Sequence, residues 1–401
     1  MHHMRADSSP PRAARLATAL LFFLNGTIIA TWATRIPAVQ ARLHLSAGAL
    51  GFALLGTAAG ALAAMNLAGY AAARFGSRSV VTVAALCFCA SLVLLALVPS
   101  LPLLIVGLVL FGAGNGSMDV SMNAQGVAVE RRYGRPILNS FHACFSLGGL
   151  AGAALGGLIA SRGIAILPHF LGVSICSILL TLLAAYFLLP ARADAQGTGV
   201  TFARPTRAIL ALGLIAFCVL LGEGAMADWS AIYLTGTLHT QAGIAATGYA
   251  AFSIMMALGR GIGDQLTVRL GARVMIRLGG LMAALGLTFA LLAVWVPLAL
   301  LGFGLVGLGL SVVFPLTLSA AGRVSKQASG TAIAAVATCG YAGGLIGPPL
   351  IGLVSDALSL RIAFALVVVL ILCAVISVQA VKKNADASQD VLQEHSTPSI
   401  P

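Results

Sequence analysis

Charge is scarce in this sequence of 401 residues: Asp, Glu, Lys and Arg make up 8% of the chain, while 59% is hydrophobic. A soluble globular protein carries about 25% charged residues, so the composition excludes an ordinary soluble domain. Apolar runs recur from end to end, each long enough to cross a hydrocarbon layer about 30 Å thick. The short alternating segments of a transmembrane β-barrel do not occur. The sequence therefore predicts an all-α polytopic membrane protein.

Motifs for covalent chemistry are absent as well. The sequence has no GxxxxGK(S/T) phosphate-binding loop, no HExxH metal motif, no nucleophile elbow and no Cys/His cluster. Its seven cysteines are scattered through apolar runs without CxxC spacing, which is typical of small hydrophobic side chains. We therefore expect no enzyme activity, no cofactor and no metal. Without a phosphate-binding loop, any energy-driven process would draw on an ion or solute gradient rather than on ATP.

Acidic residues are few, so the formal net charge is +12. Eighteen of the 23 Lys and Arg residues fall on one side of the predicted membrane and four on the other, with Arg260 inside a span. By the positive-inside rule, this asymmetry predicts that both termini lie in the cytoplasm. A nucleic-acid surface would not alternate with hydrophobic spans, so nucleic acid is not an expected partner. The first apolar run continues past Ile29 without a cleavage site, which predicts a retained span.

Twelve spans are predicted, and they divide into two halves. The spans are 16–37, 47–73, 79–98, 102–126, 137–161, 164–189, 208–235, 243–265, 274–295, 298–321, 329–355 and 361–381. Five segments follow from them: an N-terminal tail (1–15), a first half (16–189), a polar linker (190–207), a second half (208–381) and a C-terminal tail (382–401).

The two halves repeat at a constant offset. Arg74-Phe-Gly76-Ser-Arg78 matches Arg269-Leu-Gly271-Ala-Arg273, and 269 − 74 = 195. The same offset carries Gly112 onto Gly307, Cys144 onto Cys339 and Gly148 onto Gly343. Because one offset holds over four helix pairs, the sequence predicts two parallel six-helix pseudo-repeats, as in transporters built from two membrane halves.

These features resemble the major facilitator superfamily over essentially the whole chain. The family's loop motif, G-x-L-a-D-R-x-G-R, stands here as Gly69-Tyr-Ala-Ala-Ala73-Arg74-Phe-Gly76-Ser-Arg78, with Ala73 in place of the acid. The family carries an Arg in its fourth span; the matching position in this chain lies near Leu108, so that Arg is absent. The motif that drug antiporters carry in the fifth span occurs here without its Pro. These departures count against a common drug exporter.

Three strings are similar to a bacterial branch of that family, related to fucose permease and to the rhizopine-transport membrane protein. They are Gly116-Ser-Met-Asp119-Val-Ser-Met-Asn123, Ser140-Phe-His142 and Glu223-Gly-Ala-Met-Ala-Asp228-Trp229-Ser230. The resemblance implies proton symport of a sugar by alternating access around a central cavity. It also implies that basic loops hold the cytoplasmic side closed in the outward-open state. The arginines of these loops are Arg74, Arg78, Arg269 and Arg273. A role of these arginines as topology signals alone is an equally good explanation.

Polar side chains within the spans predict where function lies. Asn115, Asp119 and Asn123 form one stripe on the fourth span, and Asn139, His142 and Ser146 form another on the fifth. A centrally placed charge in a span costs about 2.5–3.5 kcal/mol, so such a group usually faces a cavity or a partner. We expect Asp119 and His142 to lie within direct or water-mediated reach as a proton-coupling pair; a structural hydrogen bond is the alternative.

The second half adds further candidates. Glu223 lies near mid-depth on the seventh span, close to the repeat position of Asn25, and is a second candidate proton site or an acceptor for a substrate hydroxyl; a structural role is the alternative. Arg260 and Asp264, four residues apart near the cytoplasmic end of the eighth span, predict a gating pair. The amides predicted to bind substrate are Asn25, Asn115, Asn123 and Asn139. Interfacial or core packing is an equally good explanation for the other substrate-binding candidates, which are Trp32, Asp228, Trp229, Thr338 and Tyr341.

The sequence thus predicts a monomeric secondary transporter whose partners are a small polar solute, protons and membrane lipid. A sugar-like or polyol-like solute moved by symport with protons is the first hypothesis. Efflux of hydrophobic or amphipathic compounds is the alternative within transport, and a non-transporting membrane receptor is the alternative outside it. Neither the identity of the solute nor the direction of transport follows from the sequence.

Overall fold

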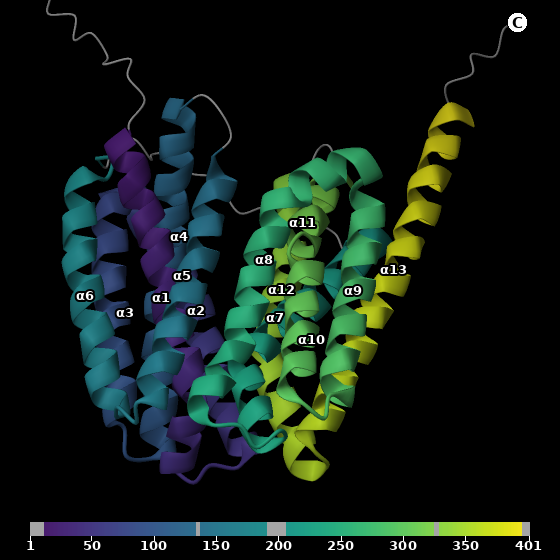
Figure 1. The fold of residues 1–401 in the computed structure, drawn as a ribbon. Helices are drawn as coiled ribbons and strands as arrows, with labels where there is room; N and C mark the ends of the chain where they lie inside the picture. The colour runs from purple at the N-terminus through teal and green to yellow at the C-terminus, as the bar shows by residue number, and fades with distance from the viewer. Residues whose placement is uncertain (1–11, 134–136, 191–205, 325–328, 395–401) are drawn as a thin grey trace, which may run out of the picture.

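The computed structural model describes residues 12–133, 137–190, 206–324 and 329–394. In these ranges the chain forms helices joined by short turns (Figure 1). The helices are α1 (Arg12–Arg42), α2 (Ala47–Phe75), α3 (Ser77–Leu97), α4 (Leu101–Tyr133), α5 (Leu138–Ser161), α6 (Ile166–Phe187), α7 (Arg207–Gly236), α8 (Ala242–Leu270), α9 (Ala272–Leu292), α10 (Val296–Leu310), α11 (Val313–Val324), α12 (Ser329–Ala357) and α13 (Leu360–Glu394).

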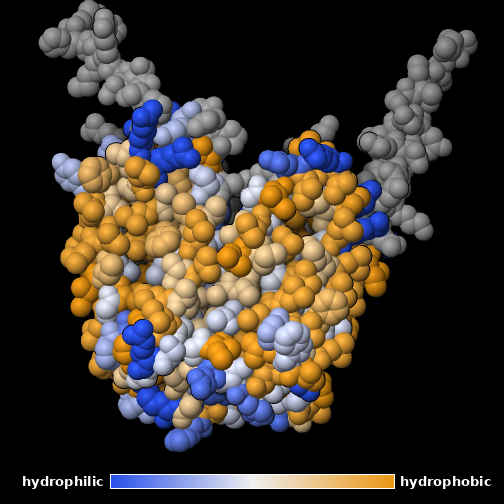
Figure 2. All heavy atoms as spheres, viewed as in Figure 1, coloured by the Kyte–Doolittle hydropathy of each residue, from blue (hydrophilic) through white to orange (hydrophobic). Residues whose placement is uncertain are grey.

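Twelve stretches of the described residues are long and apolar enough to cross a membrane, which confirms the twelve predicted spans. The tenth span, Val296–Ala321, consists of α10 and α11, separated by a turn that the sequence pattern did not predict. Figure 2 shows a broad hydrophobic belt around the molecule, with hydrophilic residues at both ends. Such a belt is what a hydrocarbon layer requires of the side chains that face it.

Several helices extend beyond their predicted ends. α4 continues to Tyr133, so Glu130, Arg131 and Arg132 lie in a helix and not in the predicted turn. The Glu130 carboxylate accepts hydrogen bonds from the backbone N–H groups of Ile137 (2.7 Å) and Leu138 (2.8 Å), and thereby caps the start of α5. The predicted linker lies mostly outside the described residues, as does part of each tail, so the segment boundaries stay predictions.

The helix contacts repeat between the halves as the sequence offset predicts. Gly112 of α4 lies so close to Thr57 of α2 that a Cβ atom would overlap the Thr57 carbonyl. Its repeat counterpart, Gly307 of α10, lies equally close to Phe252 of α8, and 252 − 57 = 195. Small residues permit such close approach between membrane helices. The glycines that recur in the sequence are therefore the points where the helices of each half touch.

The two halves meet at one end of the bundle. We call the end where α1 begins and α13 ends the terminal end, and the other the opposite end (top and bottom of Figure 1). At the opposite end, Gly51 of α2 packs on Gly352 of α12, and Gly157 of α5 packs on Gly243 of α8. Toward the terminal end, the ribbons of the two halves stand apart.

One of these two seams carries a carboxylate. Asp356 of α12 accepts hydrogen bonds from Ser46 Oγ at 2.7 Å and from the backbone N–H of Gly48 at 2.8 Å, at the start of α2. An anion is stabilised at a helix N-terminus by the unpaired N–H groups and the helix dipole. The repeat counterpart of Asp356 in the α5–α8 seam is the uncharged Ser161, which lies against Gly243.

Candidate functional site

Amide side chains join α1 and α4 in the first half. The Nδ2 of Asn25 donates a hydrogen bond of 3.1 Å to the Oδ1 of Asn115. Asn25 is only 1% exposed, whereas Asn115 retains part of its surface. A buried amide must find a partner, since an unsatisfied one costs about 1–3 kcal/mol. Asn25 and Asn115, both predicted to bind substrate, therefore form one polar unit in this structure.

Asp119 lies one turn further along α4 and faces the second half. Its carboxylate accepts a hydrogen bond of 3.1 Å from the Nδ2 of Asn123, one turn away on the same helix. Asp119 interacts electrostatically with Tyr341 of α12. Tyr341 itself is 38% exposed, so part of its side chain is not covered by the protein in this conformation.

Asp119 and His142, predicted to lie within direct or water-mediated reach, share no direct hydrogen bond among the described residues. The His142 ring packs edge-on against Phe22 of α1, with ring centroids 5.1 Å apart. Helix α1 lies against α5 along much of its length, whereas α4 and α5 barely touch. A water-mediated link between Asp119 and His142 stays a prediction.

Arg260 lies further from the end of its helix than the predicted gating pair with Asp264 required. Because α8 continues to Leu270, Arg260 is well inside the helix and reaches the first half, where its Nη1 donates a hydrogen bond of 3.3 Å to Ser146 Oγ of α5. Its guanidinium also interacts electrostatically with Glu223 of α7 and with His142. Arg260 thus lies between the polar residues of the two halves. The side chain of Asp264, its predicted gating partner, lies outside the described residues.

Tyr249 of α8 is a polar neighbour that the sequence analysis missed. It interacts electrostatically with Glu223, Asp228 and Arg260, and its hydroxyl group pairs with Ser253. Tyr249, Ser253 and Arg260 share one face of α8 at spacings of four and seven residues, a helical stripe that was present in the sequence. Tyr249 therefore lies near the two acids of α7 and near Arg260.

The two tryptophans predicted for substrate binding lie in the core. Trp32 packs against Phe111 and Phe170 at centroid distances of 6.1 and 6.5 Å. Trp229 is 0% exposed, and its indole nitrogen has no hydrogen-bond partner among the described residues. In this conformation neither ring is accessible to a solute, and neither lies in an interfacial belt.

The remaining predicted site residues lie on α5 and α12 and at the α2–α3 and α8–α9 turns. Thr338 is exposed on α12, one turn before Tyr341, and the side chain of Asn139 on α5 lies outside the described residues. The predicted gating arginines flank the α2–α3 and α8–α9 turns, where Gly76 and Gly271 adopt positive φ angles of 83° and 82°. They lie at the terminal end, away from the α2–α12 and α5–α8 seams.

Twelve spans in two pseudo-repeats, with polar side chains from both halves facing one another, define a membrane transporter of two halves. The chain belongs to the Major Facilitator Superfamily, whose model matches residues 17–212 and 212–394. This confirms the resemblance on which the sequence analysis relied.

Relatives of similar length support the assignment. An uncharacterised MFS-type transporter of Yersinia pestis is 36% identical over 377 residues, which cover 93% of this chain and 97% of the relative. The membrane protein MosC of Rhizobium meliloti is 35% identical over 366 residues, covering 89% of this chain and 88% of MosC.

Solved structures share the fold at low sequence identity. A bacterial homologue of the human lysosomal transporter Spinster, in an inward-facing and occupied conformation, aligns with a TM-score of 0.72 at 16% identity, over 94% of this chain and 97% of its own. The nucleoside transporter NupG aligns with a TM-score of 0.74 at 14% identity, over 92% and 99% of the two chains.

Proposed function

We propose that this transporter moves a small polar solute, sugar-like or polyol-like, together with protons. The observation that carries the proposal is Arg260, which lies among Glu223, His142 and Ser146 and so connects the polar residues of the two halves. The amides, hydroxyls and carboxylates around it suit a solute that offers several hydrogen-bonding groups. An exporter of hydrophobic compounds would have little use for this lining, since each unmatched polar group would lose its hydrogen bonds on binding.

Glu223 and Asp119 are the proposed proton sites. Burial in a low-dielectric site disfavours the charged form of a carboxylate, and a nearby cation favours it. Arg260 is the cation near Glu223. When Glu223 is charged, Arg260 balances it; when Glu223 takes up a proton, the guanidinium is released to bind the solute. Proton binding and solute binding are coupled in this way through one arginine.

The way the halves meet supports alternating access. The glycine contacts of the α2–α12 and α5–α8 seams close the opposite end, whereas the ribbons of the two halves stand apart toward the terminal end (Figure 1). Rocking of one half against the other would separate these seams and bring the terminal ends together. We infer that the terminal end is cytoplasmic, because its connections carry most of the arginines, and that the protein works as a monomer in a bacterial inner membrane.

The proposal is tested with the full chain in proteoliposomes. Radiolabelled sugars and polyols are offered with and without an imposed pH gradient, and empty vesicles give the background. We expect at least one solute to accumulate only when the outside is more acidic. Uptake that ignores the gradient would contradict proton coupling. Absence of any sugar or polyol uptake, together with extrusion of amphipathic dyes, would favour the efflux alternative.

A further inference from the structure

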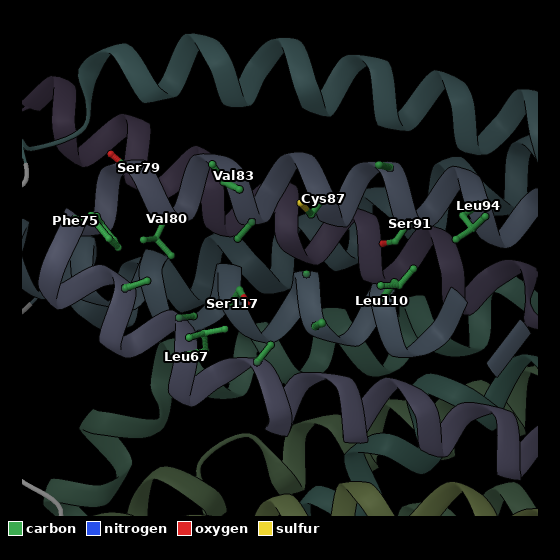
Figure 3. A pocket seen from close by; sticks show the side chains of 17 residues that line it. Leu67, Phe75, Ser79, Val80, Val83, Cys87, Ser91, Leu94, Leu110 and Ser117 are labelled. Carbon is green, nitrogen blue, oxygen red and sulfur yellow. The ribbon is translucent and has the colours of Figure 1, made fainter. Parts of the chain in front are cut away.

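A groove runs along the outer surface of the first half, separate from the polar site. It has a volume of about 740 Å³ and lies between α2 and α3, with α4 as its floor (Figure 3). Leu67 and Phe75 line it from α2, Val83 and Cys87 from α3, and Leu110 from α4. Four of these side chains are large, apolar and exposed, so the groove opens into the hydrophobic belt of the protein.

The groove exists because α2 and α3 separate after a tight turn. Gly76, at a φ of 83°, reverses the chain between them, and both helices then pack on α4 rather than on each other. Small residues form the floor between them, among them Ala113 and Gly114. Exposed apolar surface of this kind is filled by lipid in a membrane protein, because nothing else in the hydrocarbon layer covers it.

The end of the groove at the α2–α3 turn is basic. The guanidinium carbon of Arg74 lies 5.4 Å from the ring centre of Phe75, which lines the groove, and its Nη1 donates a hydrogen bond of 3.3 Å to the Tyr70 hydroxyl. Arg78 immediately precedes Ser79, another lining residue. Neither arginine forms an ion pair with a carboxylate of the described residues, so two cations lack an internal counter-charge.

The same arrangement recurs in the second half. A groove of about 480 Å³ lies between α8 and α9 on the floor of α10. Its lining residues Ile262, Leu270 and Leu278 are the repeat counterparts of Leu67, Phe75 and Val83. Arg269 and Arg273 flank its turn, as Arg74 and Arg78 flank the first. A basic turn at the end of a lateral apolar groove is therefore a repeated feature of this fold.

We propose that the groove between α2 and α3 is a binding site for an anionic phospholipid. One acyl chain lies along the groove, and the headgroup phosphate lies between Arg74 and Arg78. Arginines near a membrane surface attract anionic lipid headgroups. The apolar groove supplies affinity for any acyl chain, and the arginine pair supplies the preference for an anionic headgroup.

Native mass spectrometry of the full chain tests this site. The protein is equilibrated with equal amounts of phosphatidylglycerol and phosphatidylcholine, and the retained lipid is counted. We expect phosphatidylglycerol to be retained preferentially, and Arg74→Gln with Arg78→Gln to weaken this preference about tenfold. The control is Arg132→Gln with Arg207→Gln, which removes the same charge from exposed positions at the terminal end outside the groove.

A second pair of variants tests the groove itself. Cys87 is exposed and lines it, so Cys87→Phe should fill the wall and reduce retained phosphatidylglycerol, whereas Cys87→Ser should not. Equal retention of the two lipids by the unaltered protein would overturn the proposal. So would an equal loss of phosphatidylglycerol in the Arg132/Arg207 control, because charge alone would then explain the binding.

Discussion

The two halves of the molecule share their helix contacts but not their polar chemistry. Gly112 and Gly307 hold equivalent helices together, yet Arg260 has an apolar counterpart, Met65, at the same offset. Asp119 and His142 likewise correspond to Phe314 and Ala337. The repeated residues therefore hold the helices of each half together, and we propose that the residues that break the repeat form the site. Substitutions of the repeated glycines should change stability, whereas substitutions of the unrepeated polar residues should change transport.

The largest expected effect is on transport and comes from Arg260. Arg260→Gln removes the cation that interacts with Glu223 and the donor to Ser146. We expect uptake to fall at least about tenfold, a loss of roughly 1.4 kcal/mol, with folding retained. The control is Arg207→Gln on α7, the helix that carries Glu223; Arg207 lies exposed at the terminal end and its loss should change uptake less than about twofold. Equal losses in both variants would remove Arg260 from the site.

The next effect is on stability and should appear in both halves. Gly112→Ala places a methyl group against the Thr57 carbonyl, and Gly307→Ala places one against Phe252. Overpacking of this kind costs about 1–3 kcal/mol, so both variants should unfold at lower temperature in detergent. Gly172→Ala meets nothing within 4 Å and should raise the unfolding temperature, since Ala is the better helix former. A tolerated Gly112→Ala would show that the repeated contact is not required.

The smallest expected effect is a difference between the α2–α12 and α5–α8 seams at the opposite end. Asp356→Ala removes an acceptor shared by Ser46 and Gly48, whereas Ser161→Ala alters the uncharged counterpart seam. A carboxylate at a helix N-terminus contributes up to about 1 kcal/mol at an exposed site, so the population open at this end should rise about fivefold only in Asp356→Ala.

Distances between spin labels at positions 162 and 358, one in each half, would report that population, in a background without exposed cysteines. Both positions are exposed next to the seams, directly after the ends of α5 and α12 respectively. A similar shift in Ser161→Ala would mean that packing, and not the charge of Asp356, holds the seam.

Sequence patterns predicted the spans and the repeat because hydrophobic length and glycine spacing are local properties of the chain. They did not predict which polar groups meet across the interface between the halves. Arg260 was placed near a gate because α8 was expected to end at residue 265, and the true end at Leu270 puts it deeper. The contacts of Asp356 were not predicted because Ser46 and Gly48 lie on a helix start more than 300 residues away in the sequence. Tyr249 was missed although its stripe with Ser253 and Arg260 was present in the sequence. Distances between elements depend on packing, which no spacing rule encodes.

The central claim is that the unrepeated polar residues couple protons to solute, and one pair of assays on Asp119→Asn tests it most directly. In proteoliposomes, this variant should lose accumulation driven by a pH gradient yet keep exchange of labelled for unlabelled solute. Exchange needs binding and rocking but no net proton transfer, so it serves as the internal control for folding. Full accumulation by Asp119→Asn, dependent on the pH gradient, would contradict the account.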